Sequence, residues 1–363
     1  MNKSDIKIIL TAGGTGGHVF PAEALAKELT ARGVGIGFVT DGRGDSFSEN
    51  FPQAKVHRVF AGAYAGKPLF KKLQAMFLMG IGILQSLLIF IREKPNAVVG
   101  FGGYAAFPAS FAAGILDIPL ILHEQNAVLG GANRFLAKRA ALIATTFPTV
   151  ERVPANIKTA YTGVPVRPAV LALRDTDYTP AADTFNLLIF GGSQGAGILS
   201  SVVPAALKSL PDGVKSRLRV AQQCRAADLD AVKTAYDGSG ISVELASFFT
   251  DMADRLAAAH LVVCRAGASS IAELAVAGRP AIIVPILRSP DAHQLKNARF
   301  MAESGGAFLC EEPDFTPDRL ASMIKRFSDA PSVLAQTAGK AKELGKPDAV
   351  RLFADAVLNT ARA

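Results

Sequence analysis

The stretch IKIILTAGGTGGH (residues 6–18) and a second of the same kind, FNLLIFGGSQGA (185–196), set the architecture of this 363-residue chain. In each, an apolar run without regular polar alternation ends in a glycine-rich turn, and a helical pattern follows. Strands of this kind are buried on both faces, which is typical of parallel sheets covered by helices. Shorter units recur after each stretch, among them residues 97–103 and 261–267. The sequence therefore predicts an α/β protein with two Rossmann-like, doubly wound domains.

A proline-rich stretch separates the two series of strands. TGVPVRPAV (residues 162–170) and the polar residues 174–183 have the composition of a linker. We therefore place an N-terminal domain at residues 1–165 and a C-terminal domain at residues 166–346, in keeping with about 150 residues per domain. Residues 347–363 follow the last predicted strand and have apolar residues on one helical face, so we expect them to pack back toward the N-terminal domain.

Composition and charge limit the possible partners. The 39 Lys and Arg against 31 Asp and Glu give a net charge of +8, which favours anionic partners such as acidic lipid or a phosphorylated substrate. The basic residues form no long run, and the chain has no Trp and only five Tyr, so nucleic acid is disfavoured. Cys224, Cys264 and Cys310 lie far apart and match no metal-ligand spacing. We expect a reducing, cytoplasmic compartment, and we interpret the first residues as a buried strand and not a signal peptide.

One apolar segment, MFLMGIGILQSLLIFI at residues 76–91, is open to three interpretations. A membrane-spanning helix is disfavoured, because the segment is shorter than about 20 residues and has basic residues on both sides. A helix buried against a sheet is favoured, since one helical face is apolar throughout. The residues of that face are Leu73, Met76, Phe77, Gly80, Ile81, Leu84, Leu88 and Ile91. The third interpretation is a partly exposed apolar strip, flanked by lysines, that docks on anionic membrane.

The glycine turns lie where ligands bind in parallel sheets, beyond the carboxyl ends of strands and at helix N-termini. Neither turn satisfies G-x-G-x-x-G or contains Gly-Lys-Ser/Thr, so a dinucleotide oxidoreductase and a P-loop NTPase are disfavoured. His18 stands where a helix begins, and a helix N-terminus lowers the pKa of an imidazole so that it can act as a base. Local packing or capping by His18 is the alternative. No two histidines have a zinc-ligand spacing, so we expect no metal site.

Glu273 is the second candidate, in a helix that follows the turn RAGASS. We expect Ser269 or Ser270 to cap this helix, with its exposed amides able to hold an anion. A carboxylate in the first turns of such a helix can accept two hydrogen bonds from a ribose diol, although a capping-box Glu has the same position. Two Asp-x-Asp pairs, at residues 175–177 and 228–230, are interpreted as solvated charges.

Eight motifs of the chain occur in the order and spacing of the MurG family, which the sequence resembles over nearly its whole length. They are GGTGGHVFPA (13–22), GFGGYAAFP (100–108), HEQNAVLGGANRFLA (123–137), GVPVR (163–167), GGSQGA (191–196), FFTDM (248–252), CRAGASSIAEL (264–274) and DAHQLKNA (291–298). That family transfers N-acetylglucosamine (GlcNAc) from UDP-GlcNAc to lipid I, undecaprenyl-pyrophosphoryl-MurNAc-pentapeptide, and so makes lipid II for peptidoglycan. The resemblance implies a GT-B fold, with two Rossmann-like domains facing across a cleft, and an inverting transfer to the MurNAc 4-hydroxyl.

By motif position, the resemblance implies that the second domain binds UDP-GlcNAc. Phe249 would flank the uracil, Glu273 would hold the ribose hydroxyls, and Gln294 would hold the sugar hydroxyls. The backbone contacts to the nucleotide would come from Ala268, Ser269, Ser270, Ile271 and Ala272. Ser193 and Arg167 would contact the diphosphate. Because helix-terminal amides and Arg167 would stand in place of a divalent ion, we expect no metal and no cofactor.

The same resemblance implies that the first domain binds the acceptor. The loop residues that would approach the donor and the acceptor pyrophosphate are Thr15, Gly16 and Gly17. Those that would line the acceptor pocket are Tyr104, His123 and Glu124, and Asn126 would reach the transferred sugar. His18 is our hypothesis for the catalytic base, with Glu124 as the competing candidate. Two departures from the family pattern, Val164 and His293, leave these groups in place.

The acceptor of this family is anchored in a membrane, which gives the basic and apolar segment at residues 69–94 an expected role. We expect the protein to be peripheral on the cytoplasmic side of the inner membrane, with UDP-GlcNAc, lipid I, anionic lipid and other cell-wall synthesis proteins as partners. The residues expected at the membrane are Leu73, Phe77, Ile83, Lys71 and Lys72. Two alternatives stay open: another GT-B enzyme acting on a lipid acceptor, and a non-catalytic scaffold that binds a nucleotide sugar.

Overall fold

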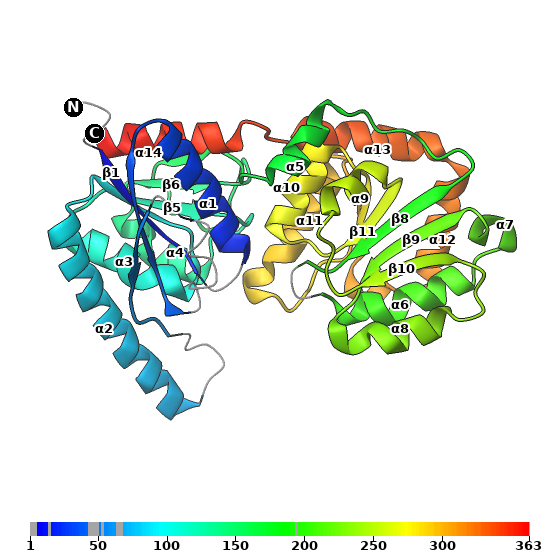
Figure 1. Ribbon diagram of the computed structural model, residues 1–363, viewed down its shortest axis with the longest axis horizontal. Helices are drawn as coiled ribbons and strands as arrows, with labels where there is room; N and C mark the ends of the chain where they lie inside the picture. The colour runs from blue at the N-terminus through cyan, green and yellow to red at the C-terminus, as the bar shows by residue number, and fades with distance from the viewer. Residues whose placement is uncertain are drawn as a thin grey trace. The chain divides into compact units, whose positions relative to one another are not determined.

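The computed structural model of the chain describes residues 6–13, 16–42, 51, 54–62, 68–192 and 195–362. It contains two compact units, each built around its own parallel sheet (Figure 1). Unit 1 comprises Met1–Pro165 and Asp348–Ala363, and unit 2 comprises Val166–Pro347. The predicted α/β class, with a doubly wound sheet in each part, is confirmed.

Unit 1 is organised by a seven-stranded sheet of order β3-β2-β1-β4-β5-β6-β7, parallel throughout the residues that the structure describes. Its strands are β1 (Lys7–Thr11), β2 (Gly35–Thr40), β3 (Lys55–Arg58), β4 (Ala97–Gly100), β5 (Leu120–Glu124), β6 (Leu142–Thr145) and β7 (Thr159–Tyr161). Successive side chains point to opposite faces, so Ile8 and Leu10 belong to one core cluster and Ile9 belongs to another. Both faces are therefore buried, as the apolar strands predict.

Helices cover both faces of this sheet. They are α1 (Gly16–Ala31), α2 (Leu69–Glu93), α3 (Gly103–Ile115), α4 (Gly131–Leu136), the 3-10 turn η3 (Ala137–Arg139) and α14 (Ala349–Arg362). Helices α1 and α14 pack together on one face, where Phe353 and Val357 of α14 join the strand core. An ion pair between Arg32, the residue after α1, and Asp355 of α14 connects the same two segments. Helices α2 and α3 contact each other on the other face (Figure 1).

Helix α2 packs through the face opposite to the one that the sequence favoured. Its buried residues are Ala75, Met79, Gly82, Ser86 and Phe90. The large apolar residues of the other face are exposed: Phe70 (79%), Leu73 (57%), Met76 (64%), Phe77 (70%), Leu84 (63%), Leu88 (57%) and Ile91 (59%). A Cβ on Gly82 would overlap the carbonyl oxygen of Phe60, so only the face with small residues can approach this closely. The expectation of a buried apolar face was wrong, because this face is exposed. Docking of the exposed strip on anionic membrane stays a prediction.

By length and composition alone, Phe70–Glu93 would suffice to cross a bilayer. Its inner side, however, packs against α3 and against the loop before α2 within unit 1. Ile83, expected at the membrane, is half buried and contacts the core cluster below α2, so it does not belong to the exposed face. The other four residues expected at the membrane, Lys71, Lys72, Leu73 and Phe77, are exposed.

Unit 2 repeats this architecture with a six-stranded sheet of order β10-β9-β8-β11-β12-β13, parallel wherever the structure describes it. Its strands are β8 (Phe185–Phe190), β9 (Leu218–Gln223), β10 (Ser242–Ala246), β11 (Leu261–Cys264), β12 (Ala281–Ile283) and β13 (Phe308–Leu309). Its helices and 3-10 turns are α5 (Pro168–Leu171), η4 (Ala172–Asp175), α6 (Gly197–Lys208), α7 (Asp212–Lys215), η5 (Ala226–Asp228), α8 (Leu229–Tyr236), α9 (Met252–Ala258), α10 (Ala268–Ala277), η6 (Pro290–Ala292), α11 (His293–Glu303), η7 (Glu312–Asp314), α12 (Pro317–Asp329) and α13 (Pro331–Leu344). Side chains of α6, α8 and α12 form a large core cluster with one face of the sheet, and α9 lies over β8 on the other face (Figure 1).

The strand order creates a switch point in each sheet. In unit 1, β1 lies next to β4, and in unit 2, β8 lies next to β11. Ligands of open parallel sheets bind beyond the carboxyl ends of the strands at such a point. The segments that follow these four strands therefore frame the candidate sites.

Candidate functional site

The first candidate site lies beyond the carboxyl ends of β1 and β4 in unit 1. His18 stands in the first turn of α1, and its Nδ1 lies 2.7 Å from the carbonyl oxygen of Phe101, which follows β4. A carbonyl oxygen only accepts hydrogen bonds, so Nδ1 has a proton and donates it. The lone pair of the neutral ring is then on Nε2, the atom available to take up a proton. Burial lowers the pKa of His18, which favours the neutral ring near pH 7.

Two glycines after β4 allow the backbone to approach this ring. Gly102 and Gly103 have φ angles of 83° and 74°, in the left-handed region that residues with a Cβ rarely adopt. A Cβ on either residue would stand 3.6 Å from atoms of the His18 ring, so the imidazole rests against this backbone. The GFGGY motif thus helps to hold the imidazole in place.

A residue that sequence reasoning missed contacts His18. The buried amide of Gln125 has its Nε2 3.1 Å from Nδ1 of His18. Strand β5, which Gln125 follows, pairs with β4, so the segment after it reaches the same edge of the sheet. The one signal in the sequence was the position of Gln125 inside HEQN, and no spacing rule connects that motif to His18.

The carboxylate of Glu124 is buried and accepts hydrogen bonds from its own loop. The backbone N–H groups of Asn126 and Gly130 donate to it at 3.0 and 2.9 Å, and the side-chain amide of Asn133 donates at 2.9 Å. The side-chain amide of Asn126 donates at 3.3 Å. Burial raises the pKa of Glu124, and these hydrogen bonds oppose the rise. Through these hydrogen bonds, Glu124 stabilises the loop after β5.

His123, expected in the acceptor pocket, lies inside unit 1. It is 1% exposed, and its ring stacks on Phe353 of α14 with 4.9 Å between ring centroids. The ring of Phe101 also contacts the His123 ring, with 5.5 Å between the two ring centroids. Burial lowers the pKa of His123 to about 3, so the ring is neutral at physiological pH. His123 therefore packs inside unit 1, between Phe353 and Phe101, and offers no group to an open pocket.

The other residues expected on the acceptor side follow β1, β4 and β5. Gly17, Tyr104 and Asn126 are half buried there. Gly16 is the first residue of α1. Thr15 lies outside the described residues.

The second candidate site lies beyond the carboxyl ends of β8 and β11 in unit 2. Helix α10 begins after β11 with Gly267 as its N-cap, and no side chain caps it. The prediction that Ser269 or Ser270 caps the helix was wrong, because both lie inside its first turn. The helix therefore presents first-turn amides to an anion.

Burial differs among the residues expected to give backbone contacts. Ala268 and Ile271 are buried, and Ser269, Ser270 and Ala272 are half buried. The amide of Ile271 already donates to the carbonyl of Gly267 at 3.0 Å. An anion at this helix end would therefore meet the amides that precede Ile271.

Glu273 and Arg167 come together although they are far apart in the sequence. Arg167 precedes α5, and its Nε and Nη2 donate to the two carboxylate oxygens of Glu273, each at 2.7 Å. The Arg167 side chain is 41% exposed and that of Glu273 is 12% exposed. The hydrogen bond to Glu273 raises the pKa of Arg167. The carboxylate expected to hold a ribose thus holds a guanidinium in this structure.

Three more residues were expected to hold the nucleotide sugar. Phe249 is buried, and Cζ of the Arg255 guanidinium lies over its ring, 3.9 Å from the ring centroid. Gln294, at the start of α11, accepts a hydrogen bond from the backbone N–H of Ile286 at 3.1 Å. Ser193 lies outside the described residues.

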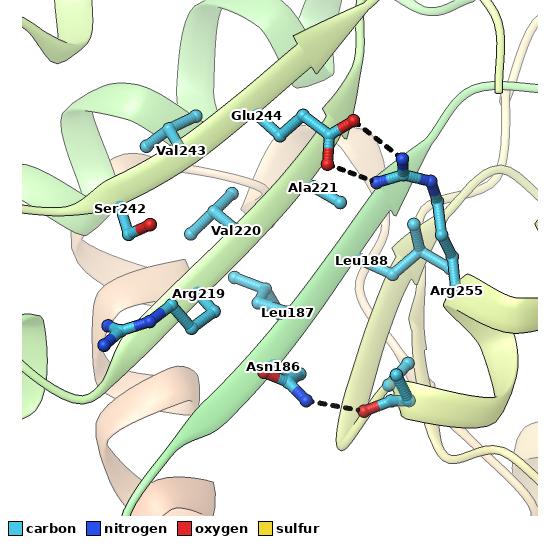
Figure 2. Close-up of a pocket in the computed structure, with 12 residues that line it drawn as sticks. Asn186, Leu187, Leu188, Arg219, Val220, Ala221, Ser242, Val243, Glu244 and Arg255 are labelled. Carbon is cyan, nitrogen blue, oxygen red and sulfur yellow. Dashed lines mark hydrogen bonds and ion pairs between the residues drawn. The ribbon is translucent and has the colours of Figure 1, made fainter.

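A hollow of about 350 Å³ lies over β8, β9 and β10 on the α9 side of the unit 2 sheet (Figure 2). Its wall includes Glu244 and Arg255, joined by two hydrogen bonds of 2.7 Å. The lining residues of β8, 186–188, belong to the first part of that strand, so the hollow lies away from the carboxyl edge. Among the described residues, no group of three or more His, Cys, Asp or Glu is placed to hold a metal ion.

Two family models match the chain: the glycosyltransferase family 28 N-terminal domain over residues 8–145, and the glycosyltransferase family 28 C-terminal domain over residues 186–353. Curated relatives are similar over nearly the full length. A protein of Paramagnetospirillum magneticum is 47% identical, covering 97% of this chain and 96% of its own. A protein of Rhodospirillum centenum is 48% identical, covering 98% of this chain and 94% of its own.

Both relatives are named UDP-N-acetylglucosamine--N-acetylmuramyl-(pentapeptide) pyrophosphoryl-undecaprenol N-acetylglucosamine transferase. Among solved structures, MurG of Acinetobacter baumannii is similar with a TM-score of 0.81. It is 30% identical in sequence, and the match covers 98% of this chain and 99% of that one.

Proposed function

The chain belongs to glycosyltransferase family 28, among its MurG transferases, and on this basis we propose that it transfers GlcNAc from UDP-GlcNAc to the MurNAc 4-hydroxyl of lipid I. The product is lipid II, the lipid-linked disaccharide used in peptidoglycan synthesis. The predicted family and its GT-B fold of two α/β domains are confirmed. For the chemistry, the supporting observation is the hydrogen bond from His18 Nδ1 to Phe101, which leaves Nε2 as a base.

Unit 2 holds the donor in this proposal. The positive end of α10 binds the diphosphate of UDP-GlcNAc, and Arg167 adds a positive charge. Glu273 accepts hydrogen bonds from the ribose hydroxyls once Arg167 has turned to the diphosphate. Phe249 and Gln294 are assigned to the uracil and to the sugar by their motifs. Because amides and Arg167 offset the charge of the leaving UDP, the proposal needs no divalent ion.

Unit 1 binds the acceptor and supplies the base. Nε2 of His18 takes the proton of the 4-hydroxyl while the oxygen attacks C1 of GlcNAc from the face opposite UDP. The bond between C1 and the β-phosphate oxygen breaks, and its electron pair leaves with UDP. The β-1,4 linkage forms with inversion, and the imidazolium then releases its proton to solvent. A positioned general base of this kind contributes about 10²–10⁴-fold to the rate.

His18 suits this role better than Glu124 does. The oxygens of Glu124 are occupied by N–H donors of its own loop, whereas Nε2 of His18 keeps its lone pair. We expect His18→Ala to lower kcat by about 10²–10⁴-fold. Near-normal turnover of His18→Ala, together with loss of activity in Glu124→Ala, would show that the assignment is wrong.

Peripheral attachment to the cytoplasmic side of the membrane is proposed through the exposed face of α2. Leu73 and Phe77 insert among acyl chains there, and Lys71 and Lys72 meet anionic headgroups, each lysine contributing about 1 kcal/mol. We expect the triple variant Phe77→Glu, Lys71→Glu and Lys72→Glu to lose co-sedimentation with vesicles that contain anionic lipid.

The matched control for this experiment is a pair of exposed lysines of unit 2, Lys325→Glu with Lys340→Glu. These substitutions change the charge of unit 2 but leave the sequence of α2 unaltered, so they should leave vesicle binding intact. Equal binding of the triple variant and the wild type would contradict the proposed attachment.

The test of the proposed function is incubation with UDP-GlcNAc and a short-chain analogue of lipid I. We expect a β-linked disaccharide product, identified by mass spectrometry and by the anomeric coupling constant. A lipid acceptor without the muramoyl peptide serves as the control, and preferential activity on it would favour another GT-B enzyme. UDP-GlcNAc binding without transfer to either acceptor would favour the non-catalytic scaffold.

A further inference from the structure

Within the part of the chain that the structure describes, Nδ1 of His18 has a second polar neighbour besides the carbonyl oxygen of Phe101. Nδ1 lies 2.7 Å from that oxygen and 3.1 Å from the amide of Gln125. Phe101 follows β4 and Gln125 follows β5, so the two neighbours come from adjacent strands. Gln125 is 6% exposed, so little water competes for its amide.

The proton on Nδ1 decides which end of the amide should face it. Because the carbonyl of Phe101 only accepts, Nδ1 is protonated and has no lone pair for an amide N–H. Two N–H groups facing each other at 3.1 Å would repel, whereas the amide turned by 180° presents Oε1 at the same place. Nδ1–H then donates to two acceptors, one after each strand.

We propose that Gln125 is a positioning residue for His18, an inference that rests on the proposed function. Its Oε1 shares the Nδ1 proton with Phe101 and fixes the tautomer in which Nε2 is the base. When Nε2 takes the proton of the 4-hydroxyl, the same oxygen stabilises the imidazolium, which burial disfavours. A glutamine does this without a charge, so the ring stays neutral before the reaction. A carboxylate in its place would hold the ring as an imidazolium.

Two ionisable groups that precede Gln125 in the chain do not replace it. His123 of β5 is neutral, because burial lowers its pKa to about 3. Glu124 is bound by the N–H groups of its loop. Asp41 follows β2 and lies beside Gly13, and Tyr104 is the second residue of α3. The described residues that lie within hydrogen-bond distance of Nδ1 are Phe101, through its carbonyl oxygen, and Gln125, through its amide.

The first test is the pH dependence of kcat for the full-length protein with the lipid I analogue. In the wild type, kcat should fall on the acid side as His18 becomes protonated. Gln125→Leu removes one acceptor of the imidazolium, so we expect kcat to drop about 10-fold and the acid limb to move to lower pH. Gln125→Glu should move the acid limb to higher pH by about one unit or more. At pH values above this shifted limb, kcat should return to the wild-type value.

The second test observes the tautomer directly. In protein labelled with ¹⁵N-histidine, the His18 signals, identified by their absence in His18→Ala, should show a protonated Nδ1 and an unprotonated Nε2 at pH 7.5. Gln125→Glu should keep this ring protonated on both nitrogens to higher pH than the wild type. An Nε2–H tautomer in the wild type would overturn the proposal.

Two controls separate a positioning role from a structural one. Gln336→Leu changes an exposed glutamine of unit 2 and should leave the pH profile unchanged. UDP-GlcNAc affinity should be the same in the wild type and in both Gln125 variants, since unit 2 holds the donor. A Gln125→Leu variant that binds UDP-GlcNAc normally and keeps the kcat and the acid limb of the wild type would overturn the proposal.

The results that would refute the proposed function differ from those that would refute the role of Gln125. If the wild type does not transfer GlcNAc to the analogue, the reaction itself is wrong. If the wild type transfers GlcNAc and His18→Ala does so at the same rate, the base is wrong. If both behave as expected and only the Gln125 variants resemble Gln336→Leu, then the role of Gln125 alone is refuted.

Discussion

Replacing Arg167 with Met separates two consequences of its ion pair with Glu273. In the structure, Arg167 occupies both carboxylate oxygens that the proposed function assigns to the ribose of the donor. A ligand with a ribose but no phosphate must displace Arg167 from Glu273, and it forms no ion pair with Arg167 in return. A ligand with a diphosphate displaces Arg167 and then binds it. The substitution should therefore act in opposite directions on uridine and on UDP.

The magnitude follows from the geometry of the pair. Two hydrogen bonds of 2.7 Å form a bidentate contact, but the Arg167 side chain is 41% exposed, so water screens much of the attraction. We take about 1 kcal/mol for such a pair, the upper end of values for exposed ion pairs. Removing Arg167 should then strengthen uridine binding about 5-fold. UDP loses a hydrogen bond to a charged group, which costs about 1.5–3 kcal/mol and outweighs that gain.

Isothermal titration calorimetry of uridine and of UDP at fixed salt measures both effects, and salt must be fixed because exposed charges are screened. Arg299→Met is the matched control, because Arg299 is similarly exposed and pairs with Glu311 at 3.5 Å elsewhere in unit 2. It should leave both affinities unchanged. Weaker uridine binding in Arg167→Met than in the wild type would refute the idea that Arg167 and the ribose compete for Glu273.

Two further predictions concern the stability of unit 1. Burial lowers the pKa of His123 to about 3, so between about pH 6.5 and pH 3 the unfolded state binds the proton more readily than the folded state. The free energy of unfolding should therefore decrease as the pH falls below about 6.5. Between pH 6.5 and 4.5, urea unfolding should show a decrease that is about 2–3 kcal/mol smaller in His123→Phe than in the wild type. Gly82→Val should destabilise the protein by about 3 kcal/mol, because a side chain there meets the backbone of Phe60, whereas Gly80→Val on the open side of α2 should have little effect. Thermal unfolding compares the two valine variants, and equal melting temperatures would contradict the packing described for α2.

Both sheets were predictable because their signal is local. In residues 6–18 and again in 185–196, an apolar strand, a glycine turn and a helix start follow one another directly. Such units form parallel sheets, and ligands of parallel sheets bind at the strand ends, so His18 could be chosen as a candidate from its place after the turn. Glu273 was chosen in the same way from its place after RAGASS.

Helix α2 shows where local pattern was insufficient. Its sequence predicts a helix, but both of its faces are apolar, so periodicity alone does not decide which face is buried. The choice depends on the fit of Gly82 against Phe60, a contact between the helix and a loop that packs over it. The number and spacing of apolar residues in a sequence give no information on shape complementarity of this kind.

From the residues alone came the two parallel sheets, the glycine turns at their strand ends and the positions of His18 and Glu273. The partners of those two side chains came only with the folded chain: Gln125 is 107 residues from His18, and Arg167 is 106 residues from Glu273. In unit 1 the order β1-β4-β5 brings His18 and Gln125 to one sheet edge. Strand order results from packing over the whole unit, and so no pattern within one segment could reveal these pairs.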